Sequence, residues 1–519
     1  MHRRAFLASL GVGSVGATTG CLDRLPVGSA DIPDPTGTDH VTERRSLDSV
    51  DPQVGAHYYP WYGSGNAWKS GVARTPTLGK YDSRDPDVIA QHVEWARRAD
   101  IDFLSVSWWG PDSYAARTLR EHMLPTDAMD RIDYSILYEL NGRFPESEHP
   151  IDFDAPANRR RLRSDFEHLA DAHFGRENHA TVDGRPLMFV YHPSAQLTGD
   201  YAAAMEGALD AIDDDPFVVA DFAGWFPLVY ADPSWLSAVD AVTAYDWYDP
   251  RSTAFDFDAD ESFDRYLDRV ATEFTRWHLA ARDHDVAFVP ATMPGYDDSA
   301  VRPEAETPPL PRSVKRFREQ TALATDFLDP EYPLAYITTF NEWHEDTAIE
   351  PAPAYGESYL DAHAETKTAS PATPALDEYA SVTLSFSDTE GEARALATTL
   401  RALELADSDK TVAAYDIGVP ADEPVITEGA YDIESDGDRT WRWLGGSAAR
   451  TVVYVPAEQL SSASTLRLFG QPKPSGLSAD VTVAGDSLPS LALDQPATGV
   501  GRYEVDLSSV TVSVPIATE

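Results

Sequence analysis

The run Val54-Gly55-Ala56-His57-Tyr58-Tyr59 is the first of eight short apolar segments that decide the fold of this 519-residue chain. These segments are rich in β-branched and aromatic residues, and they are continuously apolar rather than alternating. That pattern is typical of parallel strands buried on both faces. The other seven segments are residues 103–109, 134–138, 187–191, 217–222, 241–245, 286–292 and 334–340.

Stretches with helical periodicity separate these predicted strands. Before one of them, Asp85-Pro86 supplies an N-cap followed by a proline at the first helical position, and Val88, His92 and Val93 then fall on one helix face. Repeated strand–helix alternation predicts an α/β fold, specifically a (β/α)8 TIM barrel. A doubly wound open sheet is the alternative, and it lacks a credible phosphate loop, because the GxGxxG match at residues 11–16 follows no strand.

The C-terminal part of the chain has a different periodicity. Residues 367–375 are rich in Thr, Ser, Ala and Pro and predict a linker between a catalytic barrel domain at 51–366 and an accessory domain at 376–519. Beyond the linker, apolar residues recur with a period of two, which predicts a small β-sandwich. Residues 390–406 are an exception, since their pattern suggests a helix.

The N-terminus resembles an export signal. Arg3-Arg4 precedes a short apolar run, as in twin-arginine signals, and small residues stand directly before Cys21, as in a lipoprotein cleavage site. We therefore expect a signal at 1–21, lipidation of Cys21, a flexible tether at 22–50, and an extracellular protein anchored at the cell surface. A cleaved signal with an incidental cysteine is the alternative.

The charge balance limits the partners. With 41 basic and 86 acidic side chains, the net charge is −45. Because binding to phosphate groups needs a basic surface, this charge excludes nucleic acid as a partner. It also leaves a lipid anchor as the only expected membrane contact. Because the acidic residues are spread over the whole chain, they predict a halophilic surface that needs salt screening rather than one face for a cationic partner. A single cysteine excludes a disulfide framework or a zinc–cysteine site.

Aromatic and polar side chains collect at the predicted strand ends, where barrel enzymes place their active sites. Flat aromatic rings beside hydrogen-bonding groups suit the C–H faces of sugars. Core packing is the alternative explanation for such aromatics, but their coincidence with several strand ends favours a pocket. The predicted substrate-binding residues are Tyr58, Tyr59, Trp61, Trp108, Trp109, His192, Tyr245, Tyr248, Asn341, Trp343 and His344.

Glu342 and Glu345 follow the eighth predicted strand and are the candidate catalytic residues. Glycoside hydrolysis generally needs one carboxyl group to protonate the leaving oxygen and a second to act as nucleophile or base. Residues three apart would face one way if the chain turns helically there, and crowding would separate their proton affinities. A solvated acidic loop is the alternative, which the interleaved Asn341, Trp343 and His344 disfavour.

Three motifs resemble glycoside hydrolase family 99, the endo-α-mannosidase family. They are Tyr58-Tyr59-Pro60-Trp61-Tyr62-Gly63, Val106-Ser107-Trp108-Trp109-Gly110-Pro111, and Phe340-Asn341-Glu342-Trp343-His344-Glu345 with Ile349-Glu350-Pro351, within residues 52–365. The resemblance implies a retaining (β/α)8 hydrolase that cleaves internal α-mannosides and needs no metal or other cofactor. It also implies that Glu342 deprotonates the sugar 2-hydroxyl to form a 1,2-anhydro sugar, while Glu345 protonates the leaving group and then activates water.

Two departures from the family pattern concern the substrate. Asp346-Thr347-Ala348 stands where the family usually has Gly-Thr-Gln, and residues 66–69 read Asn-Ala-Trp-Lys where relatives tend to have a His-Trp pair. The expected partner is an oligosaccharide or polysaccharide. The alternatives are a non-catalytic surface glycan-binding lipoprotein, or a hydrolase of another α-glycan or an acidic exopolysaccharide, for which Lys69, Arg143 and Arg185 would supply cationic contacts.

Overall fold

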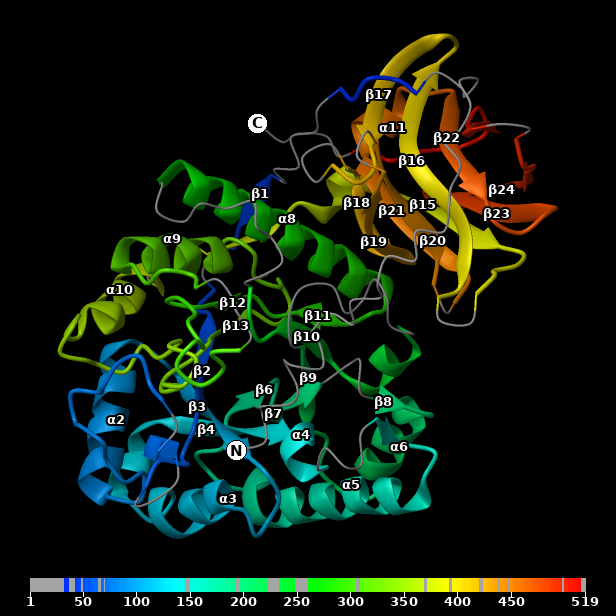
Figure 1. The fold of residues 1–519 in the computed structure, drawn as a ribbon. Coiled ribbons are helices and arrows are strands. Elements are labelled where there is room, and N and C mark those ends of the chain that lie inside the picture. The colour runs from blue at the N-terminus through cyan, green and yellow to red at the C-terminus, as the bar shows by residue number, and fades with distance from the viewer. Residues whose placement is uncertain are drawn as a thin grey trace.

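A parallel barrel and an antiparallel sandwich make up the computed structural model of this chain (Figure 1). The residues it describes are 32–36, 43–47, 50–63, 67–69, 71–144, 150–192, 197–222, 233–247, 260–304, 309–367, 371–391, 394–419, 423–436, 439–446, 448–496 and 499–514.

Every one of the eight predicted barrel strands is present. Neighbouring strands pair in parallel and follow the chain order around the sheet. The strands are β2 (Gln53–Tyr58), β3 (Phe103–Trp108), β4 (Asp133–Glu139), β7 (Arg185–His192), β9 (Phe217–Phe222), β10 (Ala241–Ala244), β11 (Ala287–Phe288) with β12 (Ala291–Thr292), and β13 (Leu334–Ile337).

The seventh strand closes the barrel although it is divided in two. Its first half, β11, pairs with β10, and its second half, β12, pairs with β13, which in turn pairs with β2. Pro290 separates the halves and has no N–H to donate to a neighbouring strand, but its carbonyl still accepts from Tyr336 N at 3.2 Å. The ladder is therefore continuous around eight strands, and the predicted (β/α)8 fold is confirmed.

Helices surround the strands, as Figure 1 shows. In α2 (Pro86–Arg98), the Asp85 side chain caps the N-terminus, and Val88, His92 and Val93 are buried as the sequence predicts. The other long helices are α5 (Pro156–Leu169), α6 (Tyr201–Leu209), α8 (Asp260–Asp283), α9 (Val314–Thr325) and α10 (Ser358–Lys367), and shorter helical segments include α3 (Tyr114–Thr118) and α4 (Leu140–Arg143).

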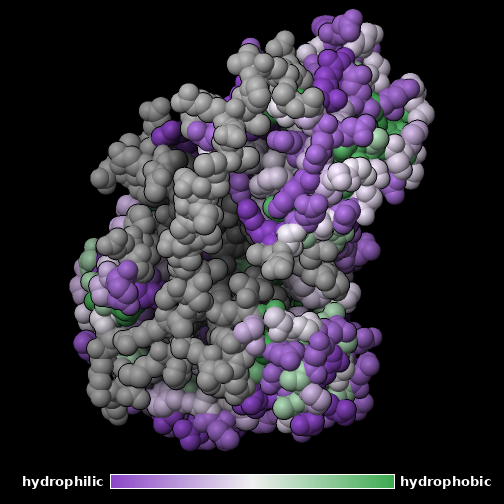
Figure 2. Space-filling model, turned by 45° about the vertical axis from the view of Figure 1, so that its right-hand side comes forward, coloured by the Kyte–Doolittle hydropathy of each residue, from purple (hydrophilic) through white to green (hydrophobic). Residues whose placement is uncertain are grey.

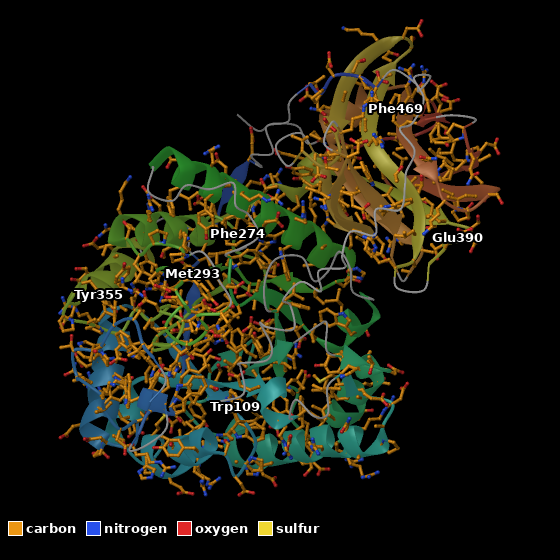
Figure 3. The ribbon with its side chains drawn as sticks, viewed as in Figure 1. Trp109, Phe274, Met293, Tyr355, Glu390 and Phe469 are labelled. Atoms are coloured by element: carbon orange, nitrogen blue, oxygen red, sulfur yellow. The ribbon has the colours of Figure 1, made fainter. Side chains whose placement is uncertain are left out.

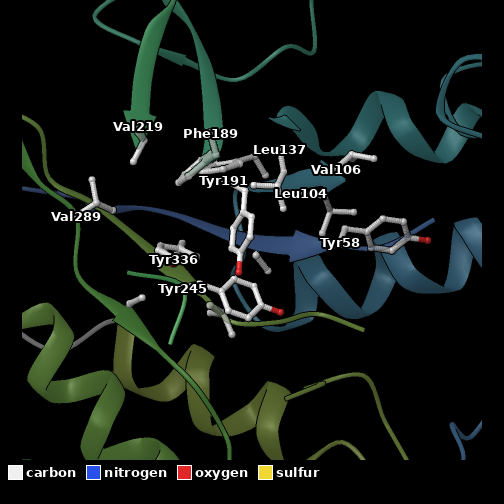
Figure 4. Packing of buried hydrophobic residues seen from close by; sticks show 14 of the residues in the cluster. Tyr58, Leu104, Val106, Leu137, Phe189, Tyr191, Val219, Tyr245, Val289 and Tyr336 are labelled. Atoms are coloured by element: carbon white, nitrogen blue, oxygen red, sulfur yellow. The ribbon is translucent and has the colours of Figure 1, made fainter. Parts of the chain in front are cut away.

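Large side chains fill the barrel interior. Figure 4 shows Tyr191 and Tyr245 pointing toward each other near Tyr336, and the rings of Tyr191 and Tyr245 meet edge to face at 5.8 Å. His57, which is fully buried, lies 4.5 Å from the ring of Tyr336. The interior is therefore a packed core rather than a pore.

The C-terminal domain is a sandwich of two antiparallel sheets. One sheet has the order β18-β21-β15-β23-β24, and the other has β19-β20-β16-β22-β25 with β17 beside β16. Their strands are β15 (Tyr379–Phe386), β16 (Leu396–Asp407), β17 (Lys410–Asp416), β18 (Val425–Glu428), β19 (Ala430–Ser435), β20 (Thr440–Gly445), β21 (Arg450–Pro456), β22 (Thr465–Pro472), β23 (Leu477–Val483), β24 (Asp486–Leu493) and β25 (Gly501–Asp506), with the helix α11 (Ala457–Ser461) after β21.

The helix suggested for residues 390–406 is wrong, because the structure has the central strand β16 there. Both faces of this strand are buried. Leu400, Leu403 and Leu405 belong to the core between the sheets, whereas Ala402 packs with Phe469, which Figure 3 labels, on the other face. A strand buried on both faces loses the two-residue alternation that identifies a half-buried strand, and bulges further disrupt its register.

Helix α8 joins the barrel to the sandwich. Leu279 packs with Val425, Val452 and Tyr454, and the Arg282 guanidinium donates to the Leu376 carbonyl at 2.9 Å. Within the segments predicted as tether and linker, β1 (Arg44–Ser46) pairs with β14 (Ala372–Pro374).

The described surface is mainly hydrophilic on the face in Figure 2, where hydrophobic residues show as small patches. Among the described helices, none combines the length and apolar character needed to cross a bilayer.

Candidate active site

The loop after β13 carries both candidate catalytic glutamates, and hydrogen bonds to strand β2 fix its position. The Phe340 amide donates to the His57 carbonyl at 2.8 Å. Asn341 then clamps Tyr59, because its Oδ1 accepts from Tyr59 N at 2.7 Å and its Nδ2 donates to Tyr59 O at 3.1 Å. The first and last strands of the barrel thus hold the loop at their carboxyl ends.

Glu342 is 1% exposed, and several donors meet one of its oxygens. Its Oε1 accepts from the His344 backbone N at 3.0 Å, lies 2.9 Å from His344 Nδ1, and accepts from the Tyr62 hydroxyl at 3.5 Å. Burial and the nearby Glu342 charge raise the pKa of Tyr62 well above its usual value, so this hydroxyl keeps its proton and can donate. These donors hold the Glu342 carboxyl group in one orientation.

Glu345 is 3% exposed and has different partners. Arg302 Nη2 donates to its Oε1 at 2.9 Å, and the Tyr245 hydroxyl donates to its Oε2 at 3.1 Å. Burial lowers the pKa of Arg302, but the Glu345 carboxylate outweighs that effect and the net pKa is raised. The two glutamates therefore lie in unlike environments, one held by His344 and Tyr62 and the other by Arg302 and Tyr245.

Tyr59 and Tyr245 extend the contacts of Glu345 toward strand β2. The Tyr59 hydroxyl donates to the Tyr245 hydroxyl at 3.2 Å, and both side chains are buried. The structure thus brings together Tyr59, Tyr245 and Glu345, which the sequence predicted for one site from three separate strand ends.

Trp61 and Trp109 are half-buried and supply aromatic surface beside this cluster. Their rings meet edge to face at 5.9 Å, and Figure 3 places Trp109 in the barrel domain near α4. The Trp109 indole N–H donates to Ser107 Oγ at 2.7 Å, and Ser107 Oγ donates to Glu139 Oε1 at 2.8 Å. A fixed indole plane of this kind suits stacking on a sugar ring.

Other predicted sugar contacts are fully buried and bind protein groups. The Tyr58 hydroxyl lies 2.9 Å from His92 Nδ1, Trp108 stacks on Tyr138 at 5.4 Å, and the Trp343 indole donates to Glu350 Oε2 at 2.8 Å. Together with Asn341, these buried residues contact other protein groups. The predictions for Tyr248, Cys21 and the side chain of His192 fall outside the described residues.

Sequence reasoning missed several groups that shape the site. Tyr62 and Glu350 stand inside the quoted motifs, and Glu350 accepts from the Tyr81 hydroxyl at 2.8 Å while it lies 3.3 Å from His92 Nε2. Their motif membership was a usable signal. Arg302 had none, because only the fold brings the segment after strand seven to Glu345.

The basic residues invoked for an acidic polymer do not gather at this site. Arg185 begins β7 at the opposite end of the barrel, where it donates to Asp240 at 2.6 Å. Arg143 lies at the carboxyl end of β4 but donates to Asp165 at 2.6 Å. The side chain of Lys69 is outside the described residues. Within the described part of the chain, no group of three or more His, Cys, Asp or Glu residues could hold a metal ion.

Comparisons with known proteins give the same family as the motifs. Residues 33–153 match the model of glycosyl hydrolase family 99. Mouse glycoprotein endo-alpha-1,2-mannosidase is 24% identical over 313 residues, which cover 59% of this chain and 62% of that protein. The Xenopus laevis enzyme of the same name is 24% identical over 285 residues, covering 53% and 58%. The chain thus matches about three-fifths of the length of these relatives.

One solved structure shares the fold of this chain, and a second is similar in sequence. A glycoside hydrolase-like protein has a TM-score of 0.51 at 18% identity, covering 66% of this chain and 96% of its own. The GH99 endo-alpha-mannosidase of Bacteroides thetaiotaomicron has a TM-score of 0.47 at 21% identity, covering 61% and 96%. Over the parts of the chain that these comparisons cover, the sequence is similar to glycosyl hydrolase family 99 and to its endo-alpha-mannosidase relatives.

Proposed function

We propose that this chain is a retaining, endo-acting glycoside hydrolase that cleaves α-mannoside linkages in glycans or polysaccharides. The observation that carries the proposal is the pair Glu342 and Glu345, buried on one loop at the barrel mouth and held by different partners. Two buried carboxyl groups with different partners can supply the acid and the base that glycoside hydrolysis needs. The names of the mammalian and amphibian relatives support the α-mannoside as substrate.

The proposed reaction has two steps. In the first, Glu342 takes the proton of the sugar 2-hydroxyl, O2 attacks the anomeric carbon, and the glycosidic bond breaks as Glu345 protonates the leaving oxygen. In the second, Glu345 takes a proton from water, the water oxygen attacks the anomeric carbon of the 1,2-anhydro sugar, and the bond between that carbon and O2 breaks as Glu342 returns its proton to O2. Two inversions give net retention.

The test incubates the chain without residues 1–21, in molar salt, with α-linked manno- and gluco-oligosaccharides and reads the products by mass spectrometry. We expect internal cleavage of an α-mannoside, with retention by NMR, and we expect Glu342→Gln and Glu345→Gln to abolish it. Glu206→Gln, on the exposed face of α6, is the matched control. Glycan binding by folded protein without any cleavage would favour the non-catalytic binding protein instead.

We further propose export through the twin-arginine signal and anchoring through a lipid on Cys21, a proposal that rests on residues 1–21 of the sequence. In the native host, the full chain should partition into the detergent phase of Triton X-114, and Cys21→Ser should move it to the aqueous phase. Aqueous partition of the unaltered chain would instead favour a cleaved signal with an incidental cysteine.

A further inference from the structure

His344 bridges two acceptors. Its Nδ1 lies 2.9 Å from Glu342 Oε1, and its Nε2 lies 2.9 Å from the carbonyl oxygen of Ala67. A carbonyl oxygen can only accept, so the hydrogen bond to Ala67 requires a proton on Nε2. The proton between Nδ1 and Oε1 then belongs either to an imidazolium facing a carboxylate or to a carboxylic acid facing a neutral ring.

The surroundings of Oε1 favour the first arrangement. The Tyr62 hydroxyl and the His344 backbone N–H also donate to this oxygen, and donors that converge on one oxygen stabilise a carboxylate rather than an acid. The Tyr62 ring also stacks on the His344 ring, with centroids 5.7 Å apart and an interplanar angle of 22°, and Trp61 lies 6.3 Å away. Aromatic faces stabilise a cation.

We propose that His344 is an imidazolium in the resting enzyme and acts as the positioning residue that keeps Glu342 ionised and oriented as the base. This inference rests on the proposed function, and it replaces the sugar-binding role predicted for His344 from the sequence. It also links the base to the loop after β2, because the same ring holds the Ala67 carbonyl. A neutral ring carries a single N–H and could therefore donate to only one of these two acceptors.

The titration of His344 has a definite direction. The groups that face the ring are Glu342, Ala67 O, Tyr62 and Trp61, and the charge of Glu345 also acts on it. Burial lowers the pKa of His344, but the hydrogen bond and charge of Glu342 outweigh it, so the net pKa is raised. The contact with Glu342 is therefore complete below the ordinary histidine pKa and is lost as the pH rises through the raised value.

An NMR experiment tests the protonation state without any turnover. Histidine labelled with 15N in the ring would be titrated in the chain lacking residues 1–21, and the His344 signals assigned by their loss in His344→Gln. We expect both ring nitrogens to show imidazolium shifts at pH 7 and Glu342→Gln to lower the midpoint. A neutral ring at pH 7, or a midpoint that Glu342→Gln leaves in place, would overturn the proposal whether or not the protein cleaves a glycan.

Kinetics then separate positioning from sugar binding. We expect His344→Gln to lower kcat by roughly 10- to 100-fold with little change in KM, and to shift the alkaline limb of the pH profile. His122→Gln, at a half-buried histidine of the helical segment Leu119–Met123, is the control and should leave both constants unchanged. A higher KM with unmoved pH limbs in His344→Gln would show that His344 contacts the sugar instead.

Discussion

Arg302 and Glu345 form a buried ion pair across the mouth of the barrel, with Nη2 2.9 Å from Oε1 and side chains that are only 8% and 5% exposed. The pair joins the segment after strand seven to the loop after strand eight. Arg302 also donates to Asp298 Oδ2 at 2.9 Å, so one guanidinium serves two carboxylates. A cation at this distance stabilises the charged form of Glu345, although the first step of the proposed reaction needs its protonated form.

Replacing Arg302 should therefore change the pH dependence of catalysis. In Arg302→Gln the carboxylate of Glu345 loses its cation and binds its proton more tightly, so the alkaline limb of kcat/KM should move to higher pH. The loss of one partner of a buried pair should also lower the free energy of unfolding by about 3–5 kcal/mol. Both effects can be measured with an α-mannoside substrate and by denaturant unfolding. Arg302→Lys keeps the positive charge, so its kcat/KM should fall at nearly the same alkaline pH as in the unaltered chain. If Arg302→Gln also leaves that pH unchanged, Arg302 does not control the reaction electrostatically.

Asp346 supports the same loop through an unusual backbone conformation. Its φ is +53°, in the left-handed region, and its buried carboxylate contacts Arg74 and lies 3.5 Å from Arg312. Asp346→Ala and Asp346→Gly both remove these ion pairs, but only glycine relieves the strain. We expect the glycine variant to be more stable than the alanine variant by about 1 kcal/mol in urea unfolding. Equal stability of the two variants would contradict a role for the backbone strain.

Glu350 anchors the far end of the catalytic loop. It is fully buried and accepts from the Tyr81 hydroxyl and the Trp343 indole, both at 2.8 Å. Glu350→Ala leaves these two donors unsatisfied and should reduce the free energy of unfolding by about 2–4 kcal/mol. Glu350→Gln keeps one acceptor oxygen and should lose less. Thermal unfolding of both variants checks the order, and equal losses would show that the acceptor oxygen is not what matters.

The barrel could be predicted from the sequence because strands buried on both faces read as continuous apolar runs, as β9 (Phe217–Phe222) does without any shift of its ends. Strand β16 could not be identified from the sequence for the same reason. Its leucine- and alanine-rich run is not part of a βα repeat, and it matches a helical pattern equally well. Periodicity reports burial, and burial alone does not separate a central strand from a buried helix.

The candidate site was also only partly predictable from the sequence. Glu342 and Glu345 could be predicted because their chemistry and their place after a strand are local features of the chain. The partners that distinguish them are not local, since Arg302 is 43 residues before Glu345 and Tyr62 is 280 residues before Glu342. The sequence also could not separate Trp61, which keeps exposed ring area, from the fully buried Trp343. That difference depends on which residues the fold packs around each ring.

The charge of the chain predicts how its stability responds to salt. A net charge of −45 repels itself in a compact fold, and ions at molar concentration reduce the screening length to about 3 Å. The urea midpoint should therefore rise steeply between 0.1 M and 2 M KCl, measured on the chain without residues 1–21. At low salt, lowering the pH toward the sequence pI of about 4.5 should also raise the urea midpoint, because it protonates surface carboxylates. This rise should be smaller than the rise with KCl, and it should end at the pH where buried pairs such as Arg302–Glu345 are disrupted. A midpoint that is independent of KCl would show that the acidic surface is not an adaptation to salt.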